Sequence, residues 1–393
     1  MAPLRIAVVG GSLGGLTAAC LLRDAGFDVT VYERSPRELE ERGAGIGLLE
    51  ATSRYLTERI GLDLDDLAIH TDVVRYLARD GSVAHETAQP YHFSSWTTVY
   101  RHLARHWGAA RYELGHEMIG FEQDDAGVTV RFANGHETRA DLLVCADGVG
   151  SLGRMLLQPS VSAQYAGYVA WRAMVPENDL PADVRDRLTD ALTYYVMANS
   201  HILVYPIPGR DGGLAPGQRL VNVVWYRNYL AGGELDDLLT GNDGVRRELS
   251  LPPGTVASHH DAEVRAVAAG RLPPPLAAVI ARTEQLFLQV IYDIEIERMA
   301  FGRVCLLGDA AYLARPHAAA GTAKAAADGW ELVAALRAEP DAIGALAAWE
   351  RGQLTLGARL LERTRTMGRR SQVDNTWTPG DPDLMLGLYG PGR

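Results

Sequence analysis

The first 33 residues constrain the fold more than any other part of the chain, because a glycine cluster there separates two apolar segments. Residues 4–9 form an apolar run of the length of a buried strand, and the apolar spacing of residues 13–25 predicts a helix. Residues 28–32 resume as a second strand. A strand, a turn, a helix and a strand in this order form a parallel unit with a right-handed crossover. The sequence therefore predicts an α/β fold with a Rossmann-like start.

The turn between this strand and helix has the character of a dinucleotide-binding loop. Gly10, Ser12, Leu13 and Gly15 lie where G-x-G-x-x-G brings backbone amides and a helix N-terminus to a pyrophosphate. Ser12 occupies the second glycine position, where a small side chain still fits. Glu33 ends the next strand at the expected distance of about 20 residues, where a carboxylate can bind a ribose and repel a 2′-phosphate.

Two further features accompany this loop. Arg34 follows the acidic residue, and Gly45 lies in a second small-residue loop, GAGIG, at residues 43–47. A purely structural interpretation is that the glycines only allow close packing of a helix on a strand, with Arg34 a solvated charge. Because Glu33 stands at the strand end, nucleotide binding is the favoured interpretation.

Two later motifs decide between FAD and NAD. Residues 145–154, CADGVGSLGR, match D-G-x-x-S-x-x-R and contain Asp147 and Gly148. Residues 302–311, GRVCLLGDAA, place Asp309 at a strand end, where its carboxylate can accept hydrogen bonds from ribityl hydroxyls. A helix expected to begin within residues 316–321 would direct its positive N-terminus at a flavin ring. The sequence therefore predicts FAD.

These three motifs, in this order over residues 10–328, resemble the flavoprotein aromatic hydroxylases of the para-hydroxybenzoate hydroxylase type. Within that family the strings YAGYVAWR at 165–172, YPIPGR at 205–210 and RPHAAAG at 315–321 are most similar to hydroxylases of dihydroxypyridines. The resemblance covers nearly the whole chain. It implies a FAD-dependent monooxygenase with Asp147 and Gly148 at the pyrophosphate region.

The same resemblance assigns the other cofactor contacts. It implies that Asp309 binds the ribityl chain and that Arg101 and Met118 lie at the ribityl and adenine sides. The expected flavin loop contains Pro316, Ala319, Ala320 and Gly321. The chain departs from the broad family at Tyr312, where a histidine is usual, and at residues 319–321, where Gly-Gln-Gly is common. These departures suggest a flavin loop shaped for a particular substrate.

The implied reaction is the hydroxylation of a small, electron-rich aromatic or N-heteroaromatic ring. NADH or NADPH reduces FAD, O2 is captured as a flavin C4a-hydroperoxide, and a ring carbon attacks its distal oxygen. No second strand-glycine-helix unit occurs, so the nicotinamide cofactor is expected to bind only transiently. The sequence does not name the substrate or choose between NADH and NADPH.

Strand alternation selects the candidate substrate residues. Tyr168 and Arg172 share one face of a predicted strand, and His201 and Tyr205 share a face of another. A phenol-like substrate must lose a proton to become nucleophilic, so His201, Tyr205 or His317 could provide or relay the base. The alternative is that His201 and Tyr205 are half-buried residues of the sheet with no chemical role.

Lys324 is singled out by composition. It is the only lysine in a chain that otherwise takes its positive charge from arginine, and it lies early in the helix after Gly321. Catalysis and simple use on a helix surface are both open for it.

The chain is expected to form a discontinuous FAD-binding domain interleaved with a substrate domain on a mainly antiparallel sheet, with C-terminal helices. Few helices are expected between residues 165 and 281, and HHD at 259–261 is expected in a loop. The predicted limits are 1–70, 98–160 and 286–370 for the FAD-binding domain, 71–97 and 161–285 for the substrate domain, and 371–393 for an irregular tail.

Composition limits the partners. A net charge of −11 disfavours nucleic acid and anionic membranes, and no apolar run is long enough to cross a bilayer. The three cysteines are far apart in apolar runs, as in reduced cytoplasmic proteins, and no metal site is predicted. The oligomeric state stays open, a homodimer included.

Two alternatives to a hydroxylase remain. One is another flavoenzyme, such as an oxidase; a halogenase is disfavoured because W-x-W-x-I-P is absent from the sequence. The other is a non-catalytic protein that keeps a dinucleotide-binding module.

Overall fold

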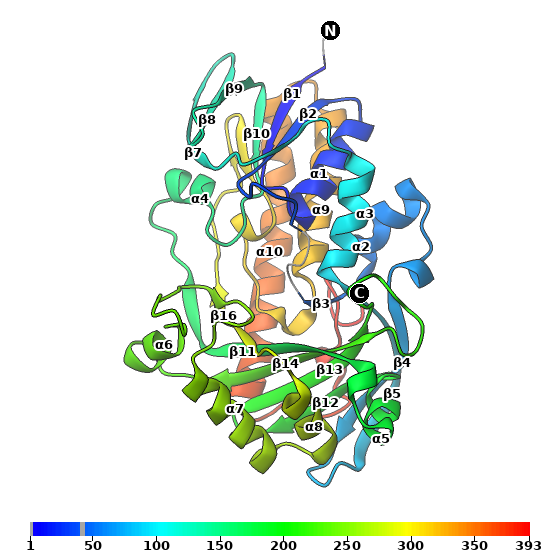
Figure 1. Ribbon diagram of the computed structural model, residues 1–393. Coiled ribbons are helices and arrows are strands. Elements are labelled where there is room, and N and C mark those ends of the chain that lie inside the picture. Colours follow the sequence, from blue (N-terminus) through cyan, green and yellow to red (C-terminus); the bar gives the residue numbers. More distant parts are fainter. Residues whose placement is uncertain (1–2, 40–43) are drawn as a thin grey trace.

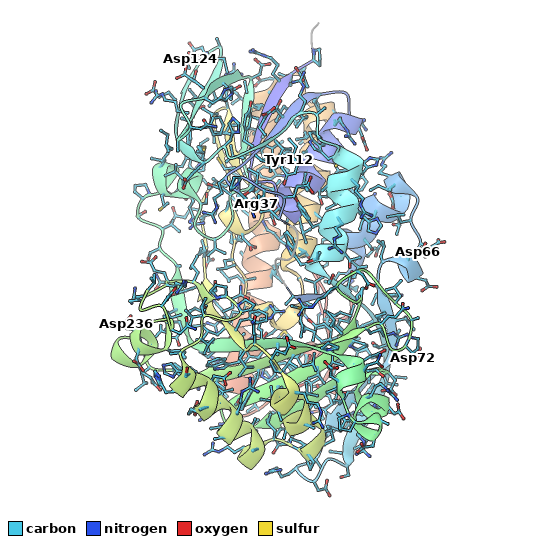
Figure 2. All side chains as sticks on the ribbon, viewed as in Figure 1. Arg37, Asp66, Asp72, Tyr112, Asp124 and Asp236 are labelled. Atoms are coloured by element: carbon cyan, nitrogen blue, oxygen red, sulfur yellow. The ribbon has the colours of Figure 1, made fainter. Side chains whose placement is uncertain are left out.

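The computed structural model describes residues 3–39 and 44–393. Its two largest sheets lie in different halves of the molecule, and one long helix, α10, runs between them (Figure 1). Figure 2 shows the acidic residues Asp66, Asp72 and Asp124 at the periphery, whereas Tyr112 lies inside the upper half. None of the described helices is long and apolar enough to cross a membrane.

The first sheet carries the predicted Rossmann-like unit. Its six strands lie in the order β17-β18-β10-β1-β2-β6 and are parallel except for the β17-β18 pair. The side chains of its central strands are almost all apolar, as is typical of parallel strands that helices cover. The strands and adjoining helices are β1 (Arg5–Val9), β2 (Asp28–Glu33), β6 (Tyr112–Leu114), β10 (Leu142–Cys145), β17 (Ala300–Phe301), β18 (Val304–Leu306), α1 (Leu13–Asp24), α3 (Trp96–Trp107) and α9 (Gly321–Ala338).

The second sheet is the predicted, mainly antiparallel one. Within residues 3–39 and 44–393 it has nine strands in the order β15-β16-β11-β14-β13-β12-β4-β5-β3, and β12 and β4 are the only parallel pair among them. The strands are β3 (Gly45–Gly47), β4 (Ile69–Leu77), β5 (Val83–Ser95), β11 (Gln164–Pro176), β12 (Ala191–Met197), β13 (Ser200–Ile207), β14 (Leu220–Asn228), β15 (Ser250–Leu251) and β16 (Phe287–Asp293).

The limits of the predicted domains differ from the sheet membership at two places. β16 pairs with β11 although residues 286–370 were expected in the FAD-binding part. β3 pairs with β5 although residues 1–70 were expected there as well. In both cases backbone pairing with a distant strand decides the membership, and no local pattern shows it.

The nine-stranded sheet has two differently covered faces. In β11, Val169 and Trp171 point into an outer apolar core, whereas Tyr168 and Ala170 point to the opposite face. The prediction of few helices in this region is wrong, because four short helices cover the outer face and bury their apolar side chains on it. They are α5 (Ala182–Leu188), α6 (Gly233–Leu238), α7 (Ser258–Arg271) and α8 (Pro274–Arg282).

Smaller elements complete the fold. A three-stranded antiparallel sheet flanks the first sheet, and two short helices flank the glycine loops. The bounds are β7 (Met118–Asp124), β8 (Gly127–Phe132), β9 (Glu137–Ala140), α2 (Glu50–Tyr55) and α4 (Leu152–Leu157). Cys20, Cys145 and Cys305 are buried and form no disulfide.

The C-terminal region is one long helix followed by a tail. α10 (Ala342–Gln372) contacts α9, β13 and β14, so it joins the two halves. The tail contains no regular element beyond one short 3-10 turn. It is nevertheless packed, since Trp377, Leu384, Leu386 and Leu388 are buried on the inner face of the second sheet.

Candidate active site

The three predicted motif loops meet at the carboxyl ends of neighbouring parallel strands. β18, β10 and β1 pair in that order, so the turns after Leu306, Cys145 and Val9 share one sheet edge. Gly10 has φ 108°, and a Cβ there would lie 2.2 Å from the carbonyl oxygen of Ala146. Only glycine permits this approach. The first and second motifs are therefore in direct contact.

Arg154 joins the second motif to the third. It is 5% exposed, and its guanidinium donates to the carbonyl oxygens of Val149 and Ala310, the latter at 3.0 Å. Ser151 caps α4 by accepting a hydrogen bond from the Arg154 backbone N–H at 3.0 Å. The serine and arginine of D-G-x-x-S-x-x-R thus hold the loop after β10 against the loop after β18.

The glycine turn opens α1 as predicted. Ser12 is the N-cap residue, and its hydroxyl makes no capping hydrogen bond within the described residues. Leu13 begins the helix and is buried. A Cβ at Gly15 would lie 1.8 Å from the Gly10 carbonyl oxygen, so helix and turn are in backbone contact. The N-terminus of α1, with its first backbone N–H groups, therefore lies at the sheet edge.

Glu33 lies beneath this turn. Its buried carboxylate accepts hydrogen bonds from the backbone N–H groups of Gly11 and Ser35, both at 2.9 Å. Arg34 is exposed next to it. The carboxylate therefore orders the glycine turn, in addition to the predicted contact with a ribose.

Two carboxylates at the sheet edge have acceptor capacity to spare. Asp147 accepts from Gly153 N–H at 3.2 Å through one oxygen, while its other oxygen is buried without a partner in the described part of the chain. Gly148, with φ 77°, turns the chain away after it. The Asp309 carboxylate receives no hydrogen bond from the described residues, and burial raises its pKa to about 6. These acceptors fit a ligand rich in hydroxyl groups, as the ribityl and ribose parts of FAD are.

The remaining predicted cofactor residues lie around this edge. Arg101 on α3 donates to the carbonyl oxygen of Arg210 at 2.8 Å, which ties α3 to the loop after β13. Met118 is buried at the start of β7. Gly45 donates its N–H to Asn222 Oδ1 at 2.9 Å, so the second small-residue loop reaches the substrate sheet.

The loop at 316–321 differs from the expected helix start. Pro316–Ala318 form a separate 3-10 turn, and α9 begins only at Gly321, with Ala320 as its N-cap residue. Ala319 between them has φ 53°, a left-handed conformation that interrupts the helix and is costly for any residue with a Cβ. A Cβ at Gly47 would lie 2.8 Å from the Ala319 methyl, so this loop packs on β3.

The inner face of the nine-stranded sheet lies against this loop. Sheet register aligns Ala170, Tyr226 and His201 in one row across three strands. His317 from the loop lies with its ring centroid 4.7 Å from Tyr226 and 5.5 Å from His201. The predicted residues Tyr168, His201 and His317 are thus brought together from three distant segments.

The Tyr168–His317 pair is the most polar part of this face. The Tyr168 hydroxyl lies 2.7 Å from His317 Nε2, and Arg315 donates to the same hydroxyl at 3.5 Å. Asp293 neutralises Arg315 through an ion pair of 2.8 Å. Burial lowers the pKa of His317 well below its ordinary value, so its imidazole is neutral. His317 Nδ1 is buried and has no partner among the residues that the structure describes.

His201 is enclosed rather than half-buried. It is 1% exposed, its Nδ1 pairs with Ser371 Oγ, and the Trp377 ring stacks on it at 4.7 Å. Burial lowers its pKa to about 3. The sequence interpretation of His201 and Tyr205 as half-buried residues is therefore wrong, since Tyr205 is 6% exposed and stacks on Phe93 at 4.2 Å.

Two further polar side chains of this face each keep one atom without a partner among the described residues. Arg172 donates to the Gly45 carbonyl oxygen at 3.1 Å, but its buried Nε has no partner there. The buried Nδ2 of Asn222 also has none, although Asn222 Oδ1 accepts the Gly45 N–H. Sequence analysis missed Asn222, although a single amide inside the apolar strand 220–226 was a usable signal.

Gly368 on α10 was also missed. A Cβ there would lie 2.4 Å from the Tyr168 hydroxyl and 3.0 Å from His317 Nε2. The helix therefore has no side chain at the position that the tyrosine–histidine pair occupies. No sequence signal distinguishes this glycine from Gly352, which is exposed on the same helix.

Lys324 is not on a helix surface. It is 2% exposed, and its Nζ pairs with Asp328 Oδ2 at 2.7 Å. It lies under the turn at Gly308 rather than on the inner face of the substrate sheet, because Asp328 also binds the Gly308 N–H.

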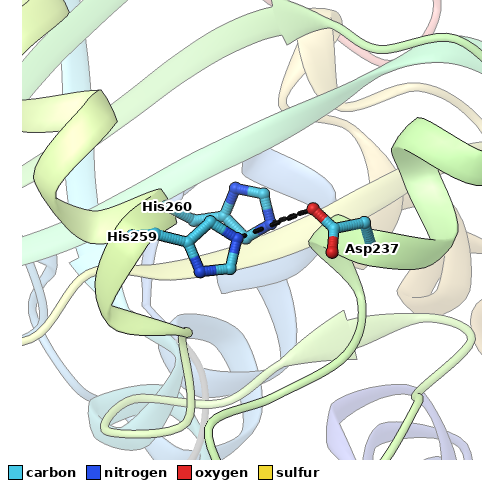
Figure 3. A group of neighbouring side chains, drawn as sticks. All are labelled: Asp237, His259 and His260. Atoms are coloured by element: carbon cyan, nitrogen blue, oxygen red, sulfur yellow. Dashed lines mark ion pairs between the residues drawn. The ribbon is translucent and has the colours of Figure 1, made fainter.

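Residues 259–261 form the first turns of α7, not a loop. His259 and His260 both approach Asp237 Oδ2 from α6, at 3.6 and 3.1 Å (Figure 3). The three side chains are close enough to hold a metal ion, although His259 and Asp237 are largely exposed. Since α6 and α7 cover the outer face of the substrate sheet, this group lies on the opposite side from His201 and His317.

The comparison with known proteins gives the family of the chain. Residues 4–228 match the FAD binding domain family, and residues 165–293 match a FAD binding domain-like family. The chain belongs to the FAD binding domain family and is a FAD-dependent monooxygenase of the aromatic hydroxylase type.

The similarity to characterised members extends over the whole chain. This chain is 36% identical to 2,6-dihydroxypyridine 3-monooxygenase of Paenarthrobacter nicotinovorans, and the match covers 98% of this chain and 96% of that protein. The structure of 2,6-dihydroxypyridine-3-hydroxylase from Arthrobacter nicotinovorans matches with a TM-score of 0.93 at 35% identity, covering 98% and 97%. Klebsiella pneumoniae HpxO, complexed with FAD and uric acid, shares the fold with a TM-score of 0.76 at 22% identity, covering 97% and 90%.

Proposed function

We propose that this monooxygenase hydroxylates a hydroxylated pyridine or a closely related N-heteroaromatic ring. The observation that carries the proposal is the set of unpaired, buried polar atoms on an otherwise aromatic face beside the flavin loop: His317 Nδ1, Asn222 Nδ2 and Arg172 Nε. Buried polar atoms without partners are costly, so a ligand that pairs with them is stabilised.

The chemistry of the three atoms supports a ring that carries both oxygen and nitrogen. Asn222 and Arg172 offer N–H donors to a ring nitrogen or a carbonyl oxygen, and His317 can accept a proton from a hydroxyl. Two relatives bear names of this substrate class, 2,6-dihydroxypyridine 3-monooxygenase and the 6-hydroxynicotinate 3-monooxygenase of Bordetella bronchiseptica, which is 26% identical over 98% of this chain.

His317 is the proposed base. Its neutral Nδ1 takes the proton of the ring hydroxyl, which raises the electron density of the ring and makes a ring carbon nucleophilic. Nε2 then donates to the Tyr168 oxygen, so the ring of His317 keeps its orientation. Burial and Arg315 both disfavour the imidazolium form, so His317 gives the proton back to the ring oxygen once the new C–O bond has formed. In this proposal His201 and Tyr205 line the substrate side of the site.

The proposed cofactor contacts are those predicted from the motifs. The α1 N-terminus with Ser12 would hold the pyrophosphate, Glu33 the ribose and Asp309 the ribityl chain. Bound FAD supplies the two-electron activation of O2 after reduction by NAD(P)H. In sum, the ring C–H and O2, with NAD(P)H and a proton, yield the ring C–OH, water and NAD(P)+. The aromatic face and the packed tail exclude water from this step.

The substrate class is tested by a screen of purified, FAD-loaded protein. Pyridinols and hydroxynicotinates are compared with simple phenols as stimulants of NADH and NADPH oxidation, with the hydroxylated product identified by mass spectrometry. We expect stimulation and product with the pyridine compounds. Stimulation only by phenols would contradict the substrate class, and peroxide without any hydroxylated product would indicate an oxidase.

The cofactor assignments are tested by flavin content. Asp309→Ala should lose FAD, and Glu33→Ala should bind it about tenfold more weakly because it also disorders the glycine turn. Parental flavin content in both variants would contradict the assignment.

A further inference from the structure

The lone lysine lies in a closed polar cluster beneath the cofactor-binding edge. Lys324 and Asp328 are 2% and 0% exposed and are one turn apart on α9. The Lys324 ammonium also lies 5.2 Å from the centroid of the Tyr312 ring. Buried ion pairs are expensive to form, so such a pair without a function is weakly favoured at best.

Asp328 connects this pair to the cofactor turn. The oxygen that binds Lys324 also accepts the Gly308 N–H at 2.9 Å, and Gly308 directly precedes Asp309. The Asp328 carbonyl oxygen accepts from Trp349 Nε1 of α10 at 2.9 Å, which locks the helix in place. The position of Asp309 therefore depends on the Asp328 carboxylate.

We propose that Lys324 is a positioning residue for the cofactor: acting through Asp328, it holds the Gly308–Asp309 turn in the geometry that binds the ribityl chain of FAD. This inference rests on the proposed cofactor site. In this proposal the effect of Lys324 is transmitted by the Asp328 carboxylate and the Gly308 backbone N–H.

The Lys324–Asp328 pair also affects the ionisation of the Asp309 carboxyl group. Arg154 from α4 and Lys324 favour its ionised form, whereas Asp328 and burial oppose it. Burial also raises the pKa of Asp328, and Lys324 counteracts that rise. Without Lys324, the carboxylates of Asp309 and Asp328 should therefore be protonated more easily. A protonated acid is a weaker acceptor for the Gly308 N–H and for ribityl hydroxyls than a carboxylate.

The choice of variants separates this role from general packing. Lys324→Met keeps the length of the side chain and removes the charge. Asp328→Asn keeps an oxygen for the Gly308 N–H, and the double variant leaves a neutral pair with no stranded charge. Arg337→Met, which removes an exposed charge from the last turn of the same helix, is the matched control.

The measurement is the FAD affinity of each apoprotein, titrated by flavin fluorescence between about pH 5 and about pH 8 without substrate. We expect Lys324→Met to bind FAD at least about tenfold more weakly and to lose affinity at a higher pH than the parent. The double variant should recover most of the affinity lost at neutral pH, and Arg337→Met should match the parent.

Two results would overturn the proposal: parental affinity and pH profile in Lys324→Met, or a double variant no better than Lys324→Met. If Lys324→Met does not fold, the comparison of Asp328→Asn with the double variant decides, because the proposal requires the double variant to bind FAD more tightly. Since no substrate is present, failure here leaves the hydroxylation screen unaffected, and failure of that screen leaves this result standing.

Discussion

At the residue scale, two neutral histidines enclosed by aromatic rings define the substrate side of the site. His317 has a free Nδ1, whereas His201 is committed to Ser371 and covered by Trp377. Both have lowered pKa values because burial disfavours the charged imidazole. On this face, the buried ring nitrogen without a partner among the described residues belongs to His317, which makes His317 the proposed proton acceptor.

The role of His317 predicts a specific pattern for His317→Gln. Glutamine keeps a polar atom near Tyr168 but removes the Nδ1 base, so we expect kcat to fall by about 10²- to 10⁴-fold with FAD content unchanged. The loss should shrink as pH rises, because the substrate then ionises in solution. The measurement is kcat against pH for the variant and for Tyr168→Phe, which should lose less. An unchanged kcat in His317→Gln would remove the histidine from the mechanism.

Burial of His201 predicts a dependence of stability on pH. Its pKa is about 3 in the folded chain against an ordinary value of 6.5. Between these values the unfolded chain binds the extra proton, so the free energy of unfolding decreases as pH falls below 6.5, approaching about 1.4 kcal/mol per pH unit. His201→Asn keeps a partner for Ser371 and should show a shallower decrease in urea unfolding. His136→Asn changes an exposed histidine and is the control, so its free energy of unfolding should depend on pH as that of the parent does. If His201→Asn shows the same pH dependence as the parent, this account is wrong.

At the element scale, α10 is shaped by what lies against it. Gly357 and Gly368 are three turns apart on one face, and they leave space for Tyr312 and for the Tyr168–His317 pair. A helix of 31 residues is thus placed closer to the site than side chains would allow. The tyrosine that replaces the usual histidine after Gly-Asp-Ala-Ala occupies one of these two spaces.

The two kinds of glycine on α10 predict opposite effects on stability. Gly352→Ala meets nothing within 4 Å and should raise the free energy of unfolding by about 0.5 to 1 kcal/mol through helix propensity. Gly357→Ala would place a Cβ 2.6 Å from the Tyr312 ring and should lower the free energy of unfolding by about 1 to 3 kcal/mol. Denaturant unfolding of both variants measures this difference. Equal effects would show that α10 does not pack against Tyr312 as described.

At the scale of the whole molecule, the site lies where the two halves and the tail meet. The flavin loop comes from the first half, the aromatic face from the second, and the tail packs on both, since Gly387 N–H donates to the Ala318 carbonyl oxygen at 3.0 Å. Arg363 on α10 holds the tail by donating to the carbonyl oxygens of Met385 and Gly387.

Loss of the hydrogen bonds between Arg363 and the tail should let water reach the site. Arg363→Met removes both hydrogen bonds, and we expect at least about twofold more of the consumed NAD(P)H to end as hydrogen peroxide instead of product. Arg359→Met, an exposed arginine on the same helix, serves as the control. The two variants are compared by peroxide and product yields with substrate present. Equal yields would mean that the tail does not seal the pocket.

Local patterns predicted the parts of the fold that depend on local physics. The apolar strand, the glycine turn and Glu33 are close in sequence, so the first parallel unit and its turn chemistry could be predicted from them. The alternation in β11 likewise predicted which side chains face inward. The four short helices between residues 182 and 282 were missed because they are stabilised by burial on the sheet and have weak signals of their own.

By itself, the sequence determined the cofactor-binding unit, the mainly antiparallel second sheet and the pairing of a flavin site with an aromatic face, because each follows from periodicity, turn chemistry or a motif. The tertiary structure alone decided that Lys324 is buried against Asp328, that Asn222 and Arg172 have unpaired atoms, and that Gly368 leaves space for His317. Lys324 and Asp328 are one helical turn apart, but their burial and the contacts of the other residues depend on segments far apart in the chain, such as those joined by the Tyr168–His317 and Arg172–Gly45 hydrogen bonds. No local pattern of residues encodes such contacts.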